Sequence, residues 1–191
     1  IENKDFDLLE YISLAVKEMS EGELLQAEKA RNFDISENLY LEIIRKKTAT
    51  LMATCCAVGA ISVNQSKKLA KKLFKFGELI GLTFQIRDDL FDYSDHKIGK
   101  PVGIDIRDKK MTLPLIHVLN KVSLKDRNWI LNTIKKYNKD KSRVKELITF
   151  VKKNGGLEYS KKIMFDYKTK ALKMLLQFPN NDFRKSLEFM L

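Results

Sequence analysis

Hydrophobic and polar positions alternate with the period of an α-helix along nearly the whole chain. In residues 5–31, the side chains of Leu8, Ile12, Ala15 and Leu24 fall on or near one stripe of a helix. No segment shows the two-residue alternation of a strand, and we find no internal repeat. The pattern predicts further helices at about 34–60, 64–93, 112–120, 123–137, 141–154 and 157–177, with a short helix after Pro179.

These elements predict an all-α fold, a bundle of long and mostly antiparallel helices with short connections. With 191 residues, the chain is long enough for a single all-α domain with a buried core. Its first helices are the more apolar ones, so we expect residues up to about 120 to form the centre. Residues from about 121 to 191 are expected to form peripheral helices.

The charge of the chain is concentrated in that peripheral part. Residues 1–120 contain 18 Lys or Arg and 18 Asp or Glu, whereas residues 121–191 contain 18 and 7, so the formal net charge of +11 arises there. Lysine-rich helices of this kind are typical of a solvated surface. A nucleic-acid or anionic-membrane patch is the alternative, but the basic residues are not interleaved with aromatic ones, so we expect no nucleic-acid partner.

The cysteines bear on the compartment, which we expect to be the cytoplasm, and the longest apolar run bears on membrane insertion. Cys55 and Cys56 are adjacent, which makes them a poor pair for an ordinary disulfide, and they match no metal-binding spacing. This favours a reducing compartment. The longest apolar run, at 48–61, is about 14 residues long, whereas a membrane span needs about 20, so no span is expected.

The most distinctive chemistry lies near the end of the predicted helix 64–93. Four oxygen-bearing side chains share an arc of about 100° on that helix: Gln85, Asp88, Asp89 and Asp92. Carboxylates so close repel one another, and a divalent cation between them removes the repulsion. Oxygen ligands alone suit Mg²⁺, which shares its coordination sphere with substrate phosphates. Gly77 and Gly81 fall on the same side, and we expect them to leave it open to a bulky ligand.

A basic loop follows these aspartates at 94–110. Its basic residues are Lys97, Lys100, Arg107, Lys109 and Lys110. A bound Mg²⁺ together with lysine point charges is a common way for proteins to hold a diphosphate. Lys47 and Thr48 border the apolar run of the second predicted helix, where another helix could carry a cation and a hydroxyl to the same pocket.

Four segments in chain order resemble the trans-isoprenyl diphosphate synthases, which form the polyprenyl synthetase family. SEGELLQ (20–26) is similar to the EGExxQ segment of the family, and KTATLMATCCAVGA (47–60) to its KTAxL helix. FQIRDDLFDY (84–93) resembles the second aspartate-rich motif. GKPVGIDIRDKKMTLPLI (99–116) resembles the diphosphate loop, with Lys109 where a glycine is usual. The resemblance covers about residues 15–120, so it places the catalytic-core helices and the diphosphate loop there.

The resemblance implies an isoprenoid synthase-like fold and a magnesium-dependent prenyl transfer. An allylic prenyl diphosphate would ionise, the double bond of isopentenyl diphosphate would attack, and a proton would leave. Asp88, Asp89 and Asp92 would hold Mg²⁺ against the allylic diphosphate. The diphosphate oxygens would be bound by Lys47, Lys100 and Lys110. The catalytic side chains near the developing cation would be Lys47, Thr48 and Gln85.

Two parts of the family pattern do not occur in residues 1–191: the first aspartate-rich motif and the N-terminal Gly-Gly-Lys segment. The chain therefore resembles the C-terminal part of a synthase, and its bundle is expected to be incomplete at the N-terminus. We expect the chain alone to be inactive in chain elongation. We also expect an exposed apolar face to favour self-association, as a homodimer.

Other functions remain open at this point. A class I terpene cyclase shares the fold and the ionisation of a diphosphate, and a non-catalytic partner subunit would share the scaffold. A basic bundle that binds nucleic acid would show steeply salt-dependent binding. A di-iron site is excluded, because neither His96 nor His117 follows a glutamate at the Glu-x-x-His spacing. His117 is expected to be a packed helix residue.

Overall fold

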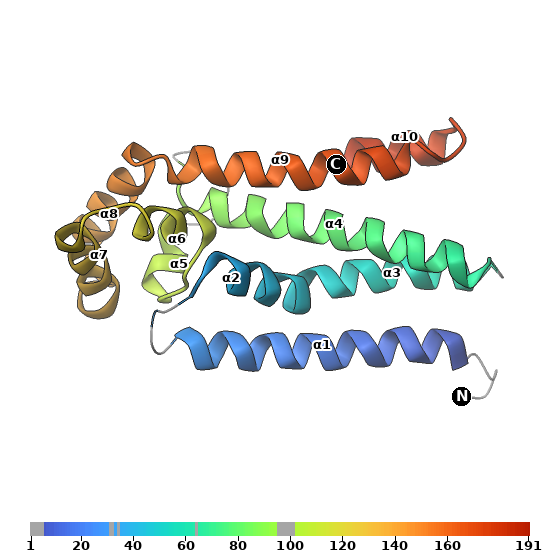
Figure 1. Ribbon diagram of the computed structural model, residues 1–191, viewed down its shortest axis with the longest axis horizontal. Helices are drawn as coiled ribbons and strands as arrows, with labels where there is room; N and C mark the ends of the chain where they lie inside the picture. The colour runs from blue at the N-terminus through green and yellow to red at the C-terminus, as the bar shows by residue number, and fades with distance from the viewer. Residues whose placement is uncertain (1–5, 31–32, 34, 64, 95–101) are drawn as a thin grey trace. The chain divides into compact units, whose positions relative to one another are not determined.

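The computed structural model describes residues 6–30, 33, 35–63, 65–94 and 102–191, and every regular element among them is helical (Figure 1). This confirms the all-α prediction. The chain divides into two compact units. The first consists of Ile1–Leu25, Glu42–Gln85 and Met164–Leu191, and the second of Gln26–Leu41 and Ile86–Ile163. The division of function near residue 120 stays a prediction.

The first unit is a layer of helices that run side by side in Figure 1. It contains most of α1 (Phe6–Ala30), the π-helix η1 (Arg45–Ala49), α3 (Thr50–Ile61), the first part of α4 (Lys67–Phe91), the end of α9 (Gly156–Leu175) and α10 (Asp182–Met190). Phe76 and Leu79 of α4 pack against Ala171 and Leu175 of α9. Small side chains line the contact between α3 and α4, which lets these helices approach closely.

Two glycines of α4 show how close that approach is. A Cβ atom on Gly77 would lie 2.6 Å from the carbonyl oxygen of Met52, and one on Gly81 would lie 2.4 Å from the Cα of Ala49. Real side chains do not approach backbone atoms so closely, so the missing Cβ atoms are what permits the packing. The expectation that these glycines keep the helix face open to a ligand is therefore wrong.

The second unit is organised around α6 (Leu113–Leu119), which is buried along its whole length. Its other elements are the first part of α2 (Glu37–Ile44), the end of α4, α5 (Ile104–Arg107), α7 (Leu124–Lys136), α8 (Lys141–Lys153) and the start of α9. The hydroxyl of Ser123 caps α7 by accepting from the backbone N–H of Asp126 at 3.2 Å. Beyond α8, Gly155 adopts a φ of 77°, the left-handed conformation that favours glycine after a helix.

Most predicted helices agree with the observed ones within a few residues. Two differences occur. The predicted helix 34–60 is interrupted by η1, and the predicted loop 94–110 contains α5. Within the described residues, no helix has both the length and the apolar character to cross a membrane.

Candidate functional site

Lys47 and Thr48 lie in η1, the π-helical segment between α2 and α3. Such π-bulges are rare and occur frequently at functional sites. The helix α1 passes very close to this segment. A Cβ atom on Gly22 would lie 2.8 Å from the backbone nitrogen of Lys47. The glycine of the EGELLQ segment therefore lets α1 pack directly on the backbone that carries two predicted catalytic residues.

Three consecutive basic residues of η1 each pair with a glutamate of α1. Arg45 pairs with Glu18 at 2.9 Å, Lys46 with Glu21 at 2.7 Å, and Lys47 with Glu23 at 2.9 Å. The hydrogen bond from Lys46 and then its charge lower the pKa of Glu21, which keeps this carboxylate ionised. The glutamates of SEGELLQ thus have a local role, which is to hold η1 against α1.

The structure brings the predicted residues Thr48 and Gln85 together. The hydroxyl of Thr48 donates a hydrogen bond of 2.9 Å to Oε1 of Gln85, across the contact between η1 and α4. A hydroxyl that donates its one proton keeps two lone pairs. Thr48 Oγ1 is therefore fixed as an acceptor, which suits it to face a positive charge.

In the second unit, Asp89 is buried and Asp88 is half-buried near the end of α4. The hydroxyl of Tyr40 on α2 donates a hydrogen bond of 2.7 Å to Oδ2 of Asp89. Burial and then the charge of Asp89 raise the pKa of Tyr40 well above its ordinary value, so this phenol stays protonated and remains a donor. The sequence contains no signal for this role of Tyr40, which lies 49 residues before Asp89.

Asp92 connects α4 to the first turn of α5. Its Oδ1 accepts from the backbone N–H of Ile104 at 2.8 Å, and its Oδ2 accepts from that of Asp105 at 3.1 Å. Burial and then the charge of Asp105 raise the pKa of Asp92 to about 6, although the backbone donors act in the opposite direction. Asp92 therefore has a structural role in addition to any role in metal binding.

Lys110 belongs to the same group of charges. Its Nζ lies 2.9 Å from Oδ1 of Asp105. Burial by itself would lower the pKa of Lys110, but the hydrogen bond and charge of Asp105 raise it overall. Asp105 is part of the GKPVGID segment, so a signal for it is present in the sequence. Lys100, the third predicted lysine, lies outside the described residues.

The donor chemistry at the end of α4 fits Mg²⁺, which prefers hard oxygen ligands. A carboxylate oxygen has two lone pairs, so a hydrogen bond from Tyr40 or from α5 does not by itself exclude a further ligand. Within the part of the chain that the structure describes, no three His, Cys, Asp or Glu side chains are arranged to hold a metal ion. Metal binding by Asp88, Asp89 and Asp92 therefore stays a prediction.

Comparison with known proteins places the chain in one family. The Polyprenyl synthetase family model matches residues 1–151. The chain is 31% identical over 178 residues to "Heptaprenyl diphosphate synthase component 2" of Bacillus subtilis, covering 92% of this chain and 50% of that protein. It is 34% identical over 169 residues to "Short chain isoprenyl diphosphate synthase" of Methanothermobacter thermautotrophicus, covering 87% and 51%.

Solved structures agree with these relatives. The crystal structure of geranylgeranyl pyrophosphate synthase from Bacteroides thetaiotaomicron superposes with a TM-score of 0.90 at 34% identity, over 99% of this chain and 63% of that one. The chain spans about half the length of the curated relatives it matches. Its fold is the all-α isoprenoid synthase fold, as the sequence predicts. The family match, the relatives and the fold together establish that this chain belongs to the polyprenyl synthetase family.

Proposed function

We propose that this protein takes part in prenyl transfer, the magnesium-dependent condensation of isopentenyl diphosphate with an allylic prenyl diphosphate. The observation that carries this proposal is the DDLFD segment at the end of α4. There, Tyr40 and the backbone of α5 orient two buried aspartates. Membership of a family whose relatives are named prenyl diphosphate synthases supports it.

The proposed roles follow the chemistry of each side chain. Asp88, Asp89 and Asp92 would hold Mg²⁺, which when bound would neutralise the diphosphate leaving group. Lys47, Lys100 and Lys110 would donate hydrogen bonds to diphosphate oxygens. Thr48 and Gln85 would direct oxygen dipoles at the developing cation, because their hydrogen bond fixes the hydroxyl as an acceptor.

Isopentenyl incorporation by the whole protein tests the proposal. The Asp88→Ala variant should lose activity by about 100-fold or more, as other losses of one transition-state contact do. Asp166→Ala, which removes an exposed carboxylate on α9, is the matched control and should keep activity. Removal of Mg²⁺ with a chelator should abolish incorporation. Full activity of Asp88→Ala would refute the role given to the DDLFD segment.

The chain taken alone is proposed not to elongate prenyl chains. Residues 1–191 contain one DDxxD segment, at 88–92, whereas the family pattern that the chain resembles has a first aspartate-rich motif as well. Purified 191-residue chain should bind diphosphate weakly in the presence of Mg²⁺ and incorporate no isopentenyl unit. Measurable incorporation by this chain would contradict the proposal directly.

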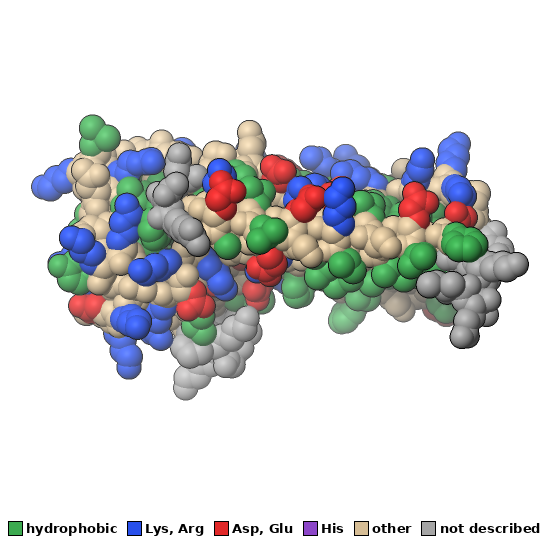
Figure 2. Space-filling model, turned by 90° about the horizontal axis from the view of Figure 1, so that it is seen from below, with side chains coloured by type: hydrophobic (Ala, Val, Ile, Leu, Met, Phe, Trp, Pro, Cys, Tyr) green, Lys and Arg blue, Asp and Glu red, His purple; other side chains and the backbone are tan. Residues whose placement is uncertain are grey.

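A homodimer is proposed through the outer face of α1. Figure 2 shows hydrophobic side chains along the face on which this helix lies. Leu9, Ile12, Val16 and Leu24 of α1 are 44 to 71% exposed, and apolar stripes of this kind mark interaction surfaces. Sedimentation should show a dimer that Ile12→Glu with Val16→Glu converts to a monomer. Leu124→Glu, on α7, should leave it intact.

Two other functions are compatible with the same scaffold. A non-catalytic partner subunit is favoured by the structural hydrogen bonds of Asp89 and Asp92, and one relative is named as a synthase component. In that case, Asp88→Ala would leave the activity of the assembled enzyme unchanged. A class I terpene cyclase would instead release a cyclic hydrocarbon or alcohol, which product analysis detects.

The cytoplasm is the proposed compartment, because Cys55 and Cys56 are both free thiols.

A further inference from the structure

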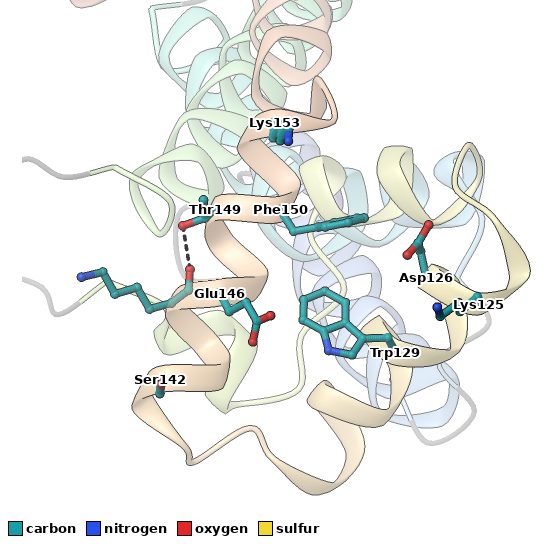
Figure 3. Close-up of a pocket in the computed structure, with 9 residues that line it drawn as sticks. Lys125, Asp126, Trp129, Ser142, Glu146, Thr149, Phe150 and Lys153 are labelled. Atoms are coloured by element: carbon teal, nitrogen blue, oxygen red, sulfur yellow. Dashed lines mark hydrogen bonds between the residues drawn. The ribbon is translucent and has the colours of Figure 1, made fainter.

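A groove of about 690 Å³ lies between α7 and α8, within the second unit (Figure 3). Trp129 of α7 and Phe150 of α8 point toward one another within it, and their rings are in contact, with centroids 5.3 Å apart and planes inclined by 57°. Both side chains remain partly exposed. The centre of the groove is therefore aromatic and accessible to a partner.

The rim of the groove is charged and predominantly basic. Lys125, Lys145 and Lys153 line it, together with Asp126 and Glu146. The hydroxyl of Ser123 donates to Asp126 at 2.7 Å, so this carboxylate is already occupied in capping α7. Residues 123–153, which form both walls, contain ten Lys or Arg and three Asp or Glu. The groove is therefore expected to attract a negatively charged partner.

The walls are held by a well-packed interior, so the groove does not need to be created by binding. Ile130 and Ile134 on the inner face of α7 are fully buried, as are Leu147 and Val151 on the inner face of α8. Side chains in such an interior keep one arrangement. A preformed groove loses less conformational entropy on association than a flexible one.

We propose that this groove binds an acidic amphipathic helix of a partner protein, with an apolar side chain of that helix seated on the contacting rings of Trp129 and Phe150. An aromatic centre inside a charged rim is the arrangement of a binding hot spot, and a helix commonly docks its apolar face in such a groove. The acidic side chains of the partner would pair with Lys125, Lys145 and Lys153.

Two other occupants fit the groove less well. An interfacial membrane-binding surface inserts protruding apolar side chains into lipid, whereas these two rings pack on one another within the groove. A single-stranded nucleic acid stacks its bases on open aromatic faces, whereas the rings of Trp129 and Phe150 pack on one another. The inference does not depend on prenyl transfer, because none of the proposed catalytic residues lines this groove.

The single tryptophan of the chain provides a direct measurement. Because Trp129 is the only one, its fluorescence reports on the groove alone. The probe is a synthetic helical peptide with leucines at i, i+4 and i+7 and glutamates on its other face. One control peptide carries lysines in place of the glutamates, and another carries serines in place of the leucines. The full-length chain is titrated with each, and circular dichroism verifies the fold of every variant.

The glutamate–leucine peptide should shift the Trp129 emission and bind about tenfold more tightly than either control, which corresponds to about 1.4 kcal/mol. Phe150→Ala and Lys145→Glu should each weaken the binding of this peptide several-fold. Phe165→Ala on α9 and Lys139→Glu between the helices do not line the groove and should leave binding unchanged. Equal binding of the lysine peptide, or no saturable shift, would overturn the proposal. Phosphatidylserine vesicles or a single-stranded oligonucleotide that bind with the same sensitivity to Phe150→Ala would also overturn it.

Discussion

The phenol of Tyr40 and the carboxylate of Asp89 form a buried hydrogen bond of 2.7 Å between residues 49 positions apart. Tyr40 retains 4% and Asp89 6% of its accessible surface, so water cannot readily replace either partner. A buried carboxylate that loses its donor costs more free energy than the bond itself contributes. This contact therefore couples α2 to the aspartate segment of α4.

Tyr40→Phe should lower the free energy of unfolding by about 1–3 kcal/mol, because it leaves a buried acceptor unsatisfied. Urea denaturation measures the change. The control is Tyr137→Phe, which removes a phenol that is 40% exposed and should have little effect. In a double-mutant cycle, Tyr40→Phe should lower the free energy of unfolding by a smaller amount when Asp89 has already been replaced by Asn. Strict additivity would mean that the two side chains are not coupled.

Gly81→Ala should destabilise the first unit, since its Cβ atom would meet the backbone of Ala49 at 2.4 Å. We expect a loss of about 1–3 kcal/mol, as for other overpacked contacts. Gly59→Ala is a matched control within a helix, because among the described residues no atom beyond the neighbouring backbone of its own helix lies within 4 Å of its Cβ position. That change should stabilise the protein by up to about 1 kcal/mol through helix propensity. Thermal unfolding compares them, and similar melting temperatures for both variants would argue against close packing at Gly81.

Thr48→Val should retain the shape of the threonine side chain and remove the hydrogen bond to Gln85. A neutral hydrogen bond contributes about 0.5–1.5 kcal/mol, so the effect on stability should be small. In the whole enzyme, the turnover number should fall more than the affinity for substrate, because the proposed contact acts on the developing cation. Steady-state kinetics separates these quantities. A rise in KM alone would show that Thr48 acts only in binding.

The stack between His117 and Tyr159 should make stability depend on pH. Their ring centroids are 3.8 Å apart and their planes are inclined by 16°, while the Tyr159 hydroxyl donates to Glu37. Burial and then the charge of Lys121 lower the pKa of His117 below 6.5. As the pH falls, the unfolded chain therefore takes up a proton at His117 before the folded chain does. The stabilising contribution of neutral His117 is present above the ordinary histidine pKa and is lost as the pH falls through the lower pKa of the folded chain.

His117→Phe keeps a ring in the stack and removes this titration. Between about pH 8 and about pH 5, the variant should lose less stability than the native chain, measured by urea denaturation. Asp92 acts in the opposite direction, because its pKa is raised to about 6 and its stabilising contribution is lost as the pH rises through that value. The comparison therefore uses the difference between the variant and the native chain. An identical pH dependence for both would contradict the assignment to His117.

The helical periodicity was a reliable guide to the elements because each helix hides one apolar face, and local spacing records that face directly. It could not reveal η1, since a π-bulge adds a residue without changing which side chains are apolar. It also misled at Gly77 and Gly81. An absent side chain can mark either an open face or a close contact, and only the neighbouring helix distinguishes them.

By itself, the sequence determined that this protein is helical, that it belongs with the prenyl synthases, and which aspartates, lysines and polar side chains are candidates for chemistry. Tertiary structure decided which of these meet. It joined Thr48 to Gln85, gave Asp89 a donor in Tyr40, attached Asp92 to α5, and placed Trp129 against Phe150. The physical reason is that the spacing of apolar residues, which predicts a helix, depends only on residues close together in the sequence. A hydrogen bond or ring contact between distant segments depends on how whole helices pack.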